Sequence, residues 1–174
     1  STFDFASDAK KSKKTARVMM QMVQKINDEH LGSISGRSAA LQVTCVTCHR
    51  GQSKPRMLED ILTVTAEEVG IEEAIEKYRE LREQYYGSFT YDFSEGVLNE
   101  VAQKLLASEN NEGAIAMLKL NTEYFPDGAA AYYFLGEAYS AQGNKELAIE
   151  NYKKVLSLQP NNPRVKSKLD ALMK

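Results

Sequence analysis

An internal repeat in the second half of the chain constrains the fold more than any other feature. Residues 110–127 (NNEGAIAMLKLNTEYFPD) match residues 144–161 (NKELAIENYKKVLSLQPN) in pattern, 34 positions later. The matched positions include Ala114 with Ala148 and Pro126 with Pro160. Apolar residues in both segments follow helical spacing, and a single helical repeat cannot bury its apolar face alone. The chain from residue 95 onward is therefore predicted to be a stack of paired helices.

A period of 34 residues with helical patterning resembles the tetratricopeptide repeat. The second copy has the expected residues at Leu135, Gly136, Tyr139, Ala148, Tyr152 and Pro160. The first copy, 95–128, is degenerate, with Val101-Ala102 and Leu105 where the motif prefers Leu-Gly and Tyr. Pro163 starts a final helix that we expect to cap the stack. Small residues at Ala102, Ala114, Gly136 and Ala148 should let paired helices approach closely. Three aromatic residues, Tyr124, Tyr132 and Tyr133, could either pack between repeats or contact a partner.

Helical patterning also covers the first half of the chain, so the predicted fold class is all-α. Over residues 9–30, Met19, Met22, Val23 and Ile26 form one apolar stripe, and Gly32 follows as a stop. Residues 31–42 lack a clear period and are predicted to be a loop. A second long helix is expected over 70–86, packed on the repeats as an extra layer, because two repeats with a cap make a short stack.

Composition and charge exclude several classes of function. No apolar run approaches the roughly 20 residues that span a bilayer. Residues 1–60 carry a net charge of +4, and the remainder carries −6. The basic residues are not interleaved with aromatic stacking residues, so nucleic acid binding is not expected. The basic run Lys10, Lys11, Lys13 and Lys14 is either a solvated helix start or a patch that steers the chain toward acidic partners.

The two cysteines of the chain lie in one short motif, Cys45-Val46-Thr47-Cys48-His49. C-x-x-C-H is the attachment pattern of haem c. On one helical turn, two thiols three residues apart can reach the two vinyl groups of a porphyrin, and the next imidazole can reach the iron. The single motif predicts one covalently attached haem. Zinc held by these three side chains and His30 is an alternative, and a redox dithiol is another, although its usual βαβ pattern is missing.

The sixth ligand of the haem iron has several candidates in the sequence. A thioether opposite histidine raises the reduction potential. The candidates are Met19, Met20, Met22, Met57 and His30. Met19 and Met22 share one helical stripe, and Met20 points about 100° away from Met19. Spacing alone does not choose between Met19 and Met22, and each methionine could instead be a core residue on an amphipathic helix.

Residues 3–55 resemble one haem-binding segment of the cytochrome subunit of photosynthetic reaction centres. The shared elements are a Phe-Ala-Ser start, an A-R-x-M-x-x-M helix that ends in Ile-Asn, and V-T-C-x-T-C-H-R-G. The resemblance implies a helix, a loop and a short helix that carries the cysteines. It also implies that Met19, directly after A-R-x, is the axial ligand, with Met22 as the alternative. His30 does not fall at the position of the family's loop histidine, which serves a neighbouring haem.

The expected organisation has three parts. Residues 1–57 form the haem-binding unit, which lacks an N-terminal part of the family's domain; 58–94 are connecting helices; and 95–174 are two tetratricopeptide-like repeats with a capping helix. The resemblance implies a bacterial electron carrier, not an enzyme, in the periplasm or at the cell surface, with redox proteins as partners and a lipid anchor as an option upstream. The alternatives are a haem-containing sensor and a docking scaffold of a redox complex. Arg17 and Arg50 are either partners of the haem propionates or surface charge.

Overall fold

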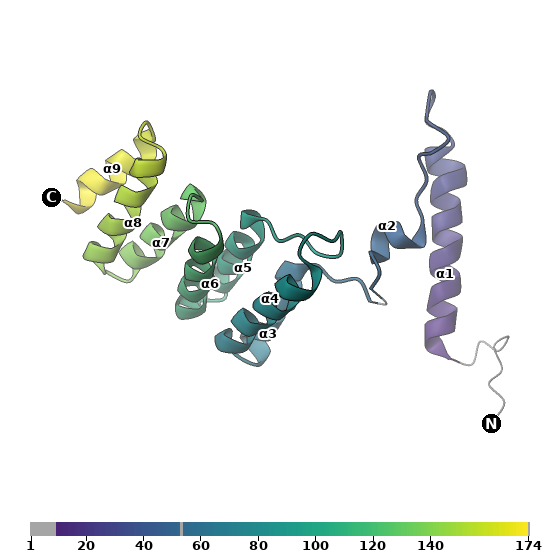
Figure 1. Cartoon of the computed structure of the whole chain (residues 1–174), viewed down its shortest axis with the longest axis horizontal. Coiled ribbons are helices and arrows are strands. Elements are labelled where there is room, and N and C mark those ends of the chain that lie inside the picture. The colour runs from purple at the N-terminus through teal and green to yellow at the C-terminus, as the bar shows by residue number, and fades with distance from the viewer. Residues whose placement is uncertain (1–9, 53, 174) are drawn as a thin grey trace. The chain divides into compact units, whose positions relative to one another are not determined.

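The structure is a computed structural model that describes residues 10–52 and 54–173. Every regular element within these residues is a helix, which confirms the predicted all-α fold (Figure 1). The chain divides into two compact units, Ser1–Pro55 and Arg56–Lys174. None of the described helices combines the length and the apolar character that a bilayer span requires.

The first unit contains α1 (Lys11–Lys25), a π-helical turn η1 (Ile26–Leu31) and the short helix α2 (Cys45–His49). Together α1 and η1 correspond to the single helix predicted over 9–30. A Cβ at Gly32 would lie 2.1 Å from the carbonyl oxygen of Asp28, so only glycine fits directly after η1. Position 9 and the Phe-Ala-Ser start of the resemblance lie outside the described residues.

The second unit is a series of antiparallel helix pairs. Its helices are α3 (Leu58–Glu68), α4 (Ile71–Tyr85), α5 (Glu95–Ala107), α6 (Asn111–Tyr124), α7 (Ala129–Ala141), α8 (Lys145–Leu158) and α9 (Pro163–Leu172). Helices α5 and α6 form one pair and α7 and α8 form another, over the residues where the two repeats are predicted, and α9 packs on α8 (Figure 1). Helix α4 pairs with α3, and this pair packs on α5 and α6. The expected extra layer is therefore present, with α3 as its second helix.

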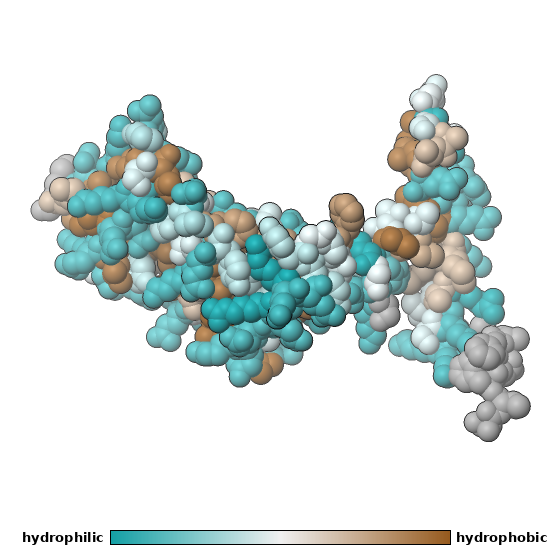
Figure 2. All heavy atoms as spheres, viewed as in Figure 1, coloured by the Kyte–Doolittle hydropathy of each residue, from teal (hydrophilic) through white to brown (hydrophobic). Residues whose placement is uncertain are grey.

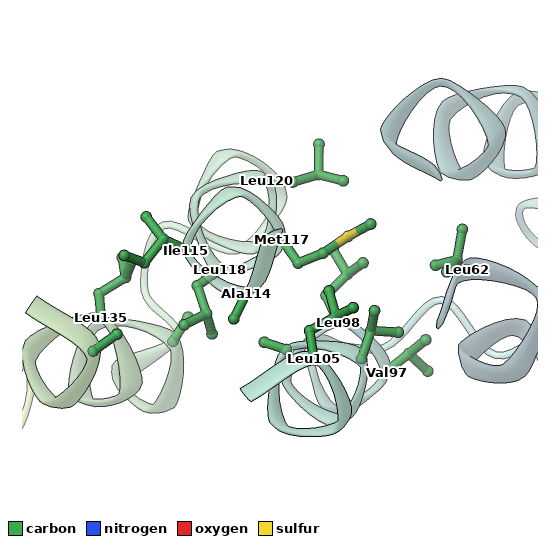
Figure 3. Packing of buried hydrophobic residues seen from close by; sticks show 14 of the residues in the cluster. Leu62, Val97, Leu98, Leu105, Ala114, Ile115, Met117, Leu118, Leu120 and Leu135 are labelled. Carbon is green, nitrogen blue, oxygen red and sulfur yellow. The ribbon is translucent and has the colours of Figure 1, made fainter. Parts of the chain in front are cut away.

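One continuous apolar core runs through the second unit. Figure 3 shows Leu98 and Leu105 of α5 facing Met117 and Leu118 of α6, with each side chain fully buried. Burying such a side chain contributes about 1.5–3 kcal/mol relative to leaving it in water. The core includes Leu62 of α3 as well. The helices between the haem motif and the repeats therefore belong to the same packed body as the repeats.

Small residues allow the close helix pairing that the sequence predicts. A Cβ at Gly136 on α7 would lie 2.6 Å from the ring of Tyr152 on α8. Ala102, Ala114 and Ala148 are buried between helices. Tyr124, Tyr132 and Tyr133, which could either pack between repeats or contact a partner, are half-buried against the core. The Tyr124 ring lies edge-on to the Tyr78 ring, with 5.3 Å between the ring centroids. Packing between helices is therefore the role that the structure supports for them.

Candidate functional site

The first unit contains a half-open cavity of about 730 Å³ between α1 and α2. Cofactor and ligand sites typically have volumes of about 300–1,000 Å³. The residues that line it are Lys11, Ser12, Thr15, Ala16, Met19, Met20, Met22, Val23, Thr44, Cys45, Cys48, His49 and Lys54. The structure therefore brings the whole C-x-x-C-H donor set and three of the candidate methionines to one cavity.

Helix α2 is short because both of its ends are fixed by local chemistry. At its start, the backbone N–H of Thr44 donates to Oγ1 of Thr47 at 2.9 Å, as in a capping box. At its end, Arg50 adopts a left-handed conformation with φ 46°, and Gly51 follows with φ 83°. This turn ends the helix directly after the motif. Cys45 and Cys48 lie one turn apart on α2 as exposed, free thiols.

The imidazole of His49 is held by a hydrogen bond to the backbone. Its Nδ1 lies 2.8 Å from the carbonyl oxygen of Gln52. A carbonyl oxygen can only accept, so Nδ1 must carry the proton and donate. The Nε2 lone pair is then left for a metal, and the hydrogen bond makes the imidazole a stronger ligand. This is the tautomer that iron coordination through Nε2 requires.

The methionines differ in how far they are exposed. Met19 is half-buried in the middle of the stripe of α1 residues that lines the cavity, whereas Met20 is 53% exposed and Met22 is 45% exposed. The other two candidates lie elsewhere. Met57 precedes α3 in the second unit, and His30 is an exposed residue of η1 that does not line the cavity.

The first unit has no apolar core of its own within its described residues, since none of them is buried. Apolar side chains such as Val18, Ile34, Leu41 and Val46 are at least half exposed, and Figure 2 shows apolar side chains on the surface of this unit. A large flat apolar group in the cavity would bury apolar side chains of α1 and α2 that are now exposed. A haem fits this requirement, because the donor set matches its thioether and axial bonds and the lysines at the cavity can face its carboxylates.

The other interpretations of the motif gain no support. Among the described residues, which include His30 and the whole motif, no three His, Cys, Asp or Glu side chains come together as a metal-binding group. The zinc set is therefore not assembled. An all-α unit also lacks the βαβ framework of redox dithiols.

The structure places residues at the cavity that sequence reasoning missed. Arg17 and Arg50, the suggested propionate partners, do not line the cavity, whereas Lys11 and Lys54 do. Helical spacing could have indicated Lys11, because it lies eight residues before Met19 and so shares its face of α1. No sequence signal indicates Lys54, which follows α2 in an irregular segment.

Comparison with known protein families gives two matches. The family model described as photosynthetic reaction centre cytochrome C subunit matches residues 1–116, and a tetratricopeptide repeat model matches residues 129–162. The first match covers about two thirds of the chain and extends beyond residues 3–55, where the resemblance was recognised, into α6. The second match covers α7 and α8. No curated protein matches the chain.

Proposed function

Because the chain belongs to the photosynthetic reaction centre cytochrome C subunit family, we propose that it is an electron carrier with one covalently bound haem c. In this proposal Cys45 and Cys48 form the two thioether bonds to the haem. Nε2 of His49 is one axial ligand of the iron, and the sulfur of Met19 is the other. The observation that supports this assignment best is the single cavity that these four residues share.

Met19 is chosen over its neighbours on geometric grounds. It lies at the centre of the cavity-lining stripe and is the least exposed of the three methionines there. A ligand that is already shielded loses little solvation and little side-chain freedom when it binds. Met22, one turn further along the same face, is the alternative ligand.

The proposed ligand set favours electron transfer over catalysis. Bound haem iron supplies a one-electron couple, and a histidine–methionine pair sets it at the high potentials of cytochromes c. His49 is fixed by Gln52 and Met19 by α1, so both axial positions are filled by side chains on ordered elements. With both side chains bound, the iron would have no open position for a substrate. In this proposal the chain's own residues would hold the haem and shield it from water, and the haem would supply the one-electron chemistry.

Redox proteins are the proposed partners. The basic first 60 residues favour partners with acidic surfaces, since complementary charge speeds association. The second unit offers a surface for docking or for packing within a larger complex. Haem c is attached outside the cytoplasm, so we infer a periplasmic or cell-surface location in bacteria. The second candidate function, a haem sensor, would require a weak or displaceable sixth ligand.

Mass spectrometry and absorption spectra of the chain, made in a host that attaches haem c, test the proposal. We expect every chain to carry one haem and the iron to be low-spin in both oxidation states. Met19→Ala should give high-spin iron, whereas the matched variants Met20→Ala and Met22→Ala should stay low-spin. The bare apoprotein mass would refute the function. Rapid carbon monoxide binding to the wild-type ferrous protein would favour the sensor function. If Met22→Ala gives high-spin iron and Met19→Ala stays low-spin, Met22 is the ligand in place of Met19.

A further inference from the structure

Asn27 connects the two helices of the haem unit through its side chain. Its Nδ2 donates to the carbonyl oxygen of Val43 at 2.7 Å, and its Oδ1 accepts from the backbone N–H of Val43 at 2.8 Å. Asn27 lies in η1, directly after α1, and Val43 lies two residues before Cys45. The amide therefore joins the end of the helix that carries Met19 to the entry of the helix that carries Cys45 and His49.

Only a carboxamide of this length can make both bonds. An aspartate could accept from the Val43 N–H but could not donate to its carbonyl while ionised. An alanine could do neither. The π-helical turn at residues 26–31 is consistent with this role, because π-turns are rare and occur frequently at functional sites.

The pair acts between helices that have no buried residues among those that the structure describes. Within these residues, no apolar core therefore fixes the distance between the helices. The segment 28–42 between them contains Gly36 with φ 74° and has no regular structure beyond η1. Closing such a segment costs conformational entropy, and the two bonds of Asn27 keep it closed.

We propose that Asn27 is a positioning residue of the haem site: by pairing with both backbone groups of Val43, it sets the separation of Met19 from the Cys45–His49 helix. This inference rests on the proposed function. The two cysteines would keep the haem on α2 with or without the Asn27–Val43 hydrogen bonds. Loss of these hydrogen bonds would therefore weaken the bond between Met19 and the iron and leave the covalent attachment of the haem unchanged.

The test is imidazole binding to the ferric, haem-loaded protein, because imidazole must displace the methionine. For Asn27→Ala we expect imidazole to bind roughly tenfold more tightly than to the wild type, as the loss of two hydrogen bonds implies. The ferric charge-transfer band of the methionine–iron bond should weaken. Gln24→Ala, an exposed position one turn earlier, is the matched control and should bind imidazole like the wild type.

Asn27→Asp adds a readout that a purely structural role would not produce. The ionised variant keeps one of the two bonds, so its imidazole affinity should lie between those of the wild type and Asn27→Ala. On acidification the protonated carboxyl can donate to the Val43 carbonyl again, and the affinity should fall back toward the wild-type value. The control should show no such change with pH relative to the wild type.

Several outcomes would overturn the inference. Wild-type imidazole affinity at neutral pH in either variant is one. Loss of haem loading in both variants, with normal loading of Gln24→Ala, is another, because Asn27 would then serve the folding of the whole unit. These outcomes differ from failure of the proposed function, in which the wild type itself carries no haem or is not low-spin.

Discussion

Gly136→Ala should destabilise the second unit, although alanine is the better helix former. The change adds one methyl group to α7, where it faces the ring of Tyr152 on α8. The added Cβ would lie 2.6 and 2.7 Å from two ring carbons, far inside the roughly 3.5–4.0 Å of normal carbon contacts. Tyr152 cannot move aside easily, because it is 1% exposed and its hydroxyl donates to Glu137.

The magnitude follows from two opposing effects. Forcing an extra carbon into a packed core costs about 1–3 kcal/mol. Replacing glycine by alanine within a helix returns about 1 kcal/mol. The net loss in the free energy of unfolding should therefore be about 1 kcal/mol. In a Tyr152→Leu background the clash is removed, so the same change should stabilise by about 1 kcal/mol, and the coupling between the two positions should be about 2 kcal/mol.

Urea unfolding followed by tyrosine fluorescence measures this effect directly. All nine tyrosines lie between residues 78 and 152, so the signal reports the second unit alone. Gly96→Ala is the matched control, since it lies on exposed α5 surface with its nearest contact at 3.7 Å. It should gain up to about 1 kcal/mol. The packing argument is refuted if Gly136→Ala stabilises the unit as much as this control does.

Two further predictions concern acid stability and haem loading. Burial raises the pKa of Glu137, but hydrogen bonds from Lys168 and Tyr152 outweigh it and hold the pKa below the usual range of a glutamate. Stability from this carboxylate is therefore present above the ordinary glutamate pKa and is lost as the pH falls through the lowered pKa. Lys168→Met should lower stability at neutral pH and weaken that acid dependence in urea titrations; an unchanged pH profile would contradict this. Thr47→Val removes the hydrogen bond from the Thr44 N–H that caps α2, which should destabilise the helix by about 1 kcal/mol. The haem-loaded fraction measured by mass spectrometry should fall in this variant, whereas the control Val46→Thr should load haem like the wild type.

Local sequence patterns were sufficient for most of the fold. Helix α4 and the pairs of the two repeats follow from apolar residues at helical spacing, and the end of η1 follows from Gly32. These predictions succeed because helix formation depends on near neighbours in the chain. The pairing of α7 with α8 was also predictable, because Gly136 and Tyr152 occupy fixed positions of a 34-residue repeat.

The family relationship was visible from fewer residues than it covers. The motif elements in residues 3–55 indicated it, whereas the family match continues to residue 116. Residues 56–116 hold α3, α4, α5 and the first part of α6, whose apolar spacing is typical of many helical proteins. Sequence reasoning placed helices there and compared those after residue 95 with a tetratricopeptide repeat, but it could not attribute the segment to the cytochrome family.

The sequence by itself determined the donor set, because Cys45, Cys48 and His49 are adjacent and their spacing on one turn depends only on helix geometry. Tertiary structure alone decided what faces that set. The cavity, the presence of Lys11 and Lys54 in its lining, and the Asn27–Val43 hydrogen bonds all depend on how α1 and α2 meet across an irregular loop. Such a loop has no periodicity, so the distance between its ends is fixed by hydrogen bonds and packing that no local pattern encodes.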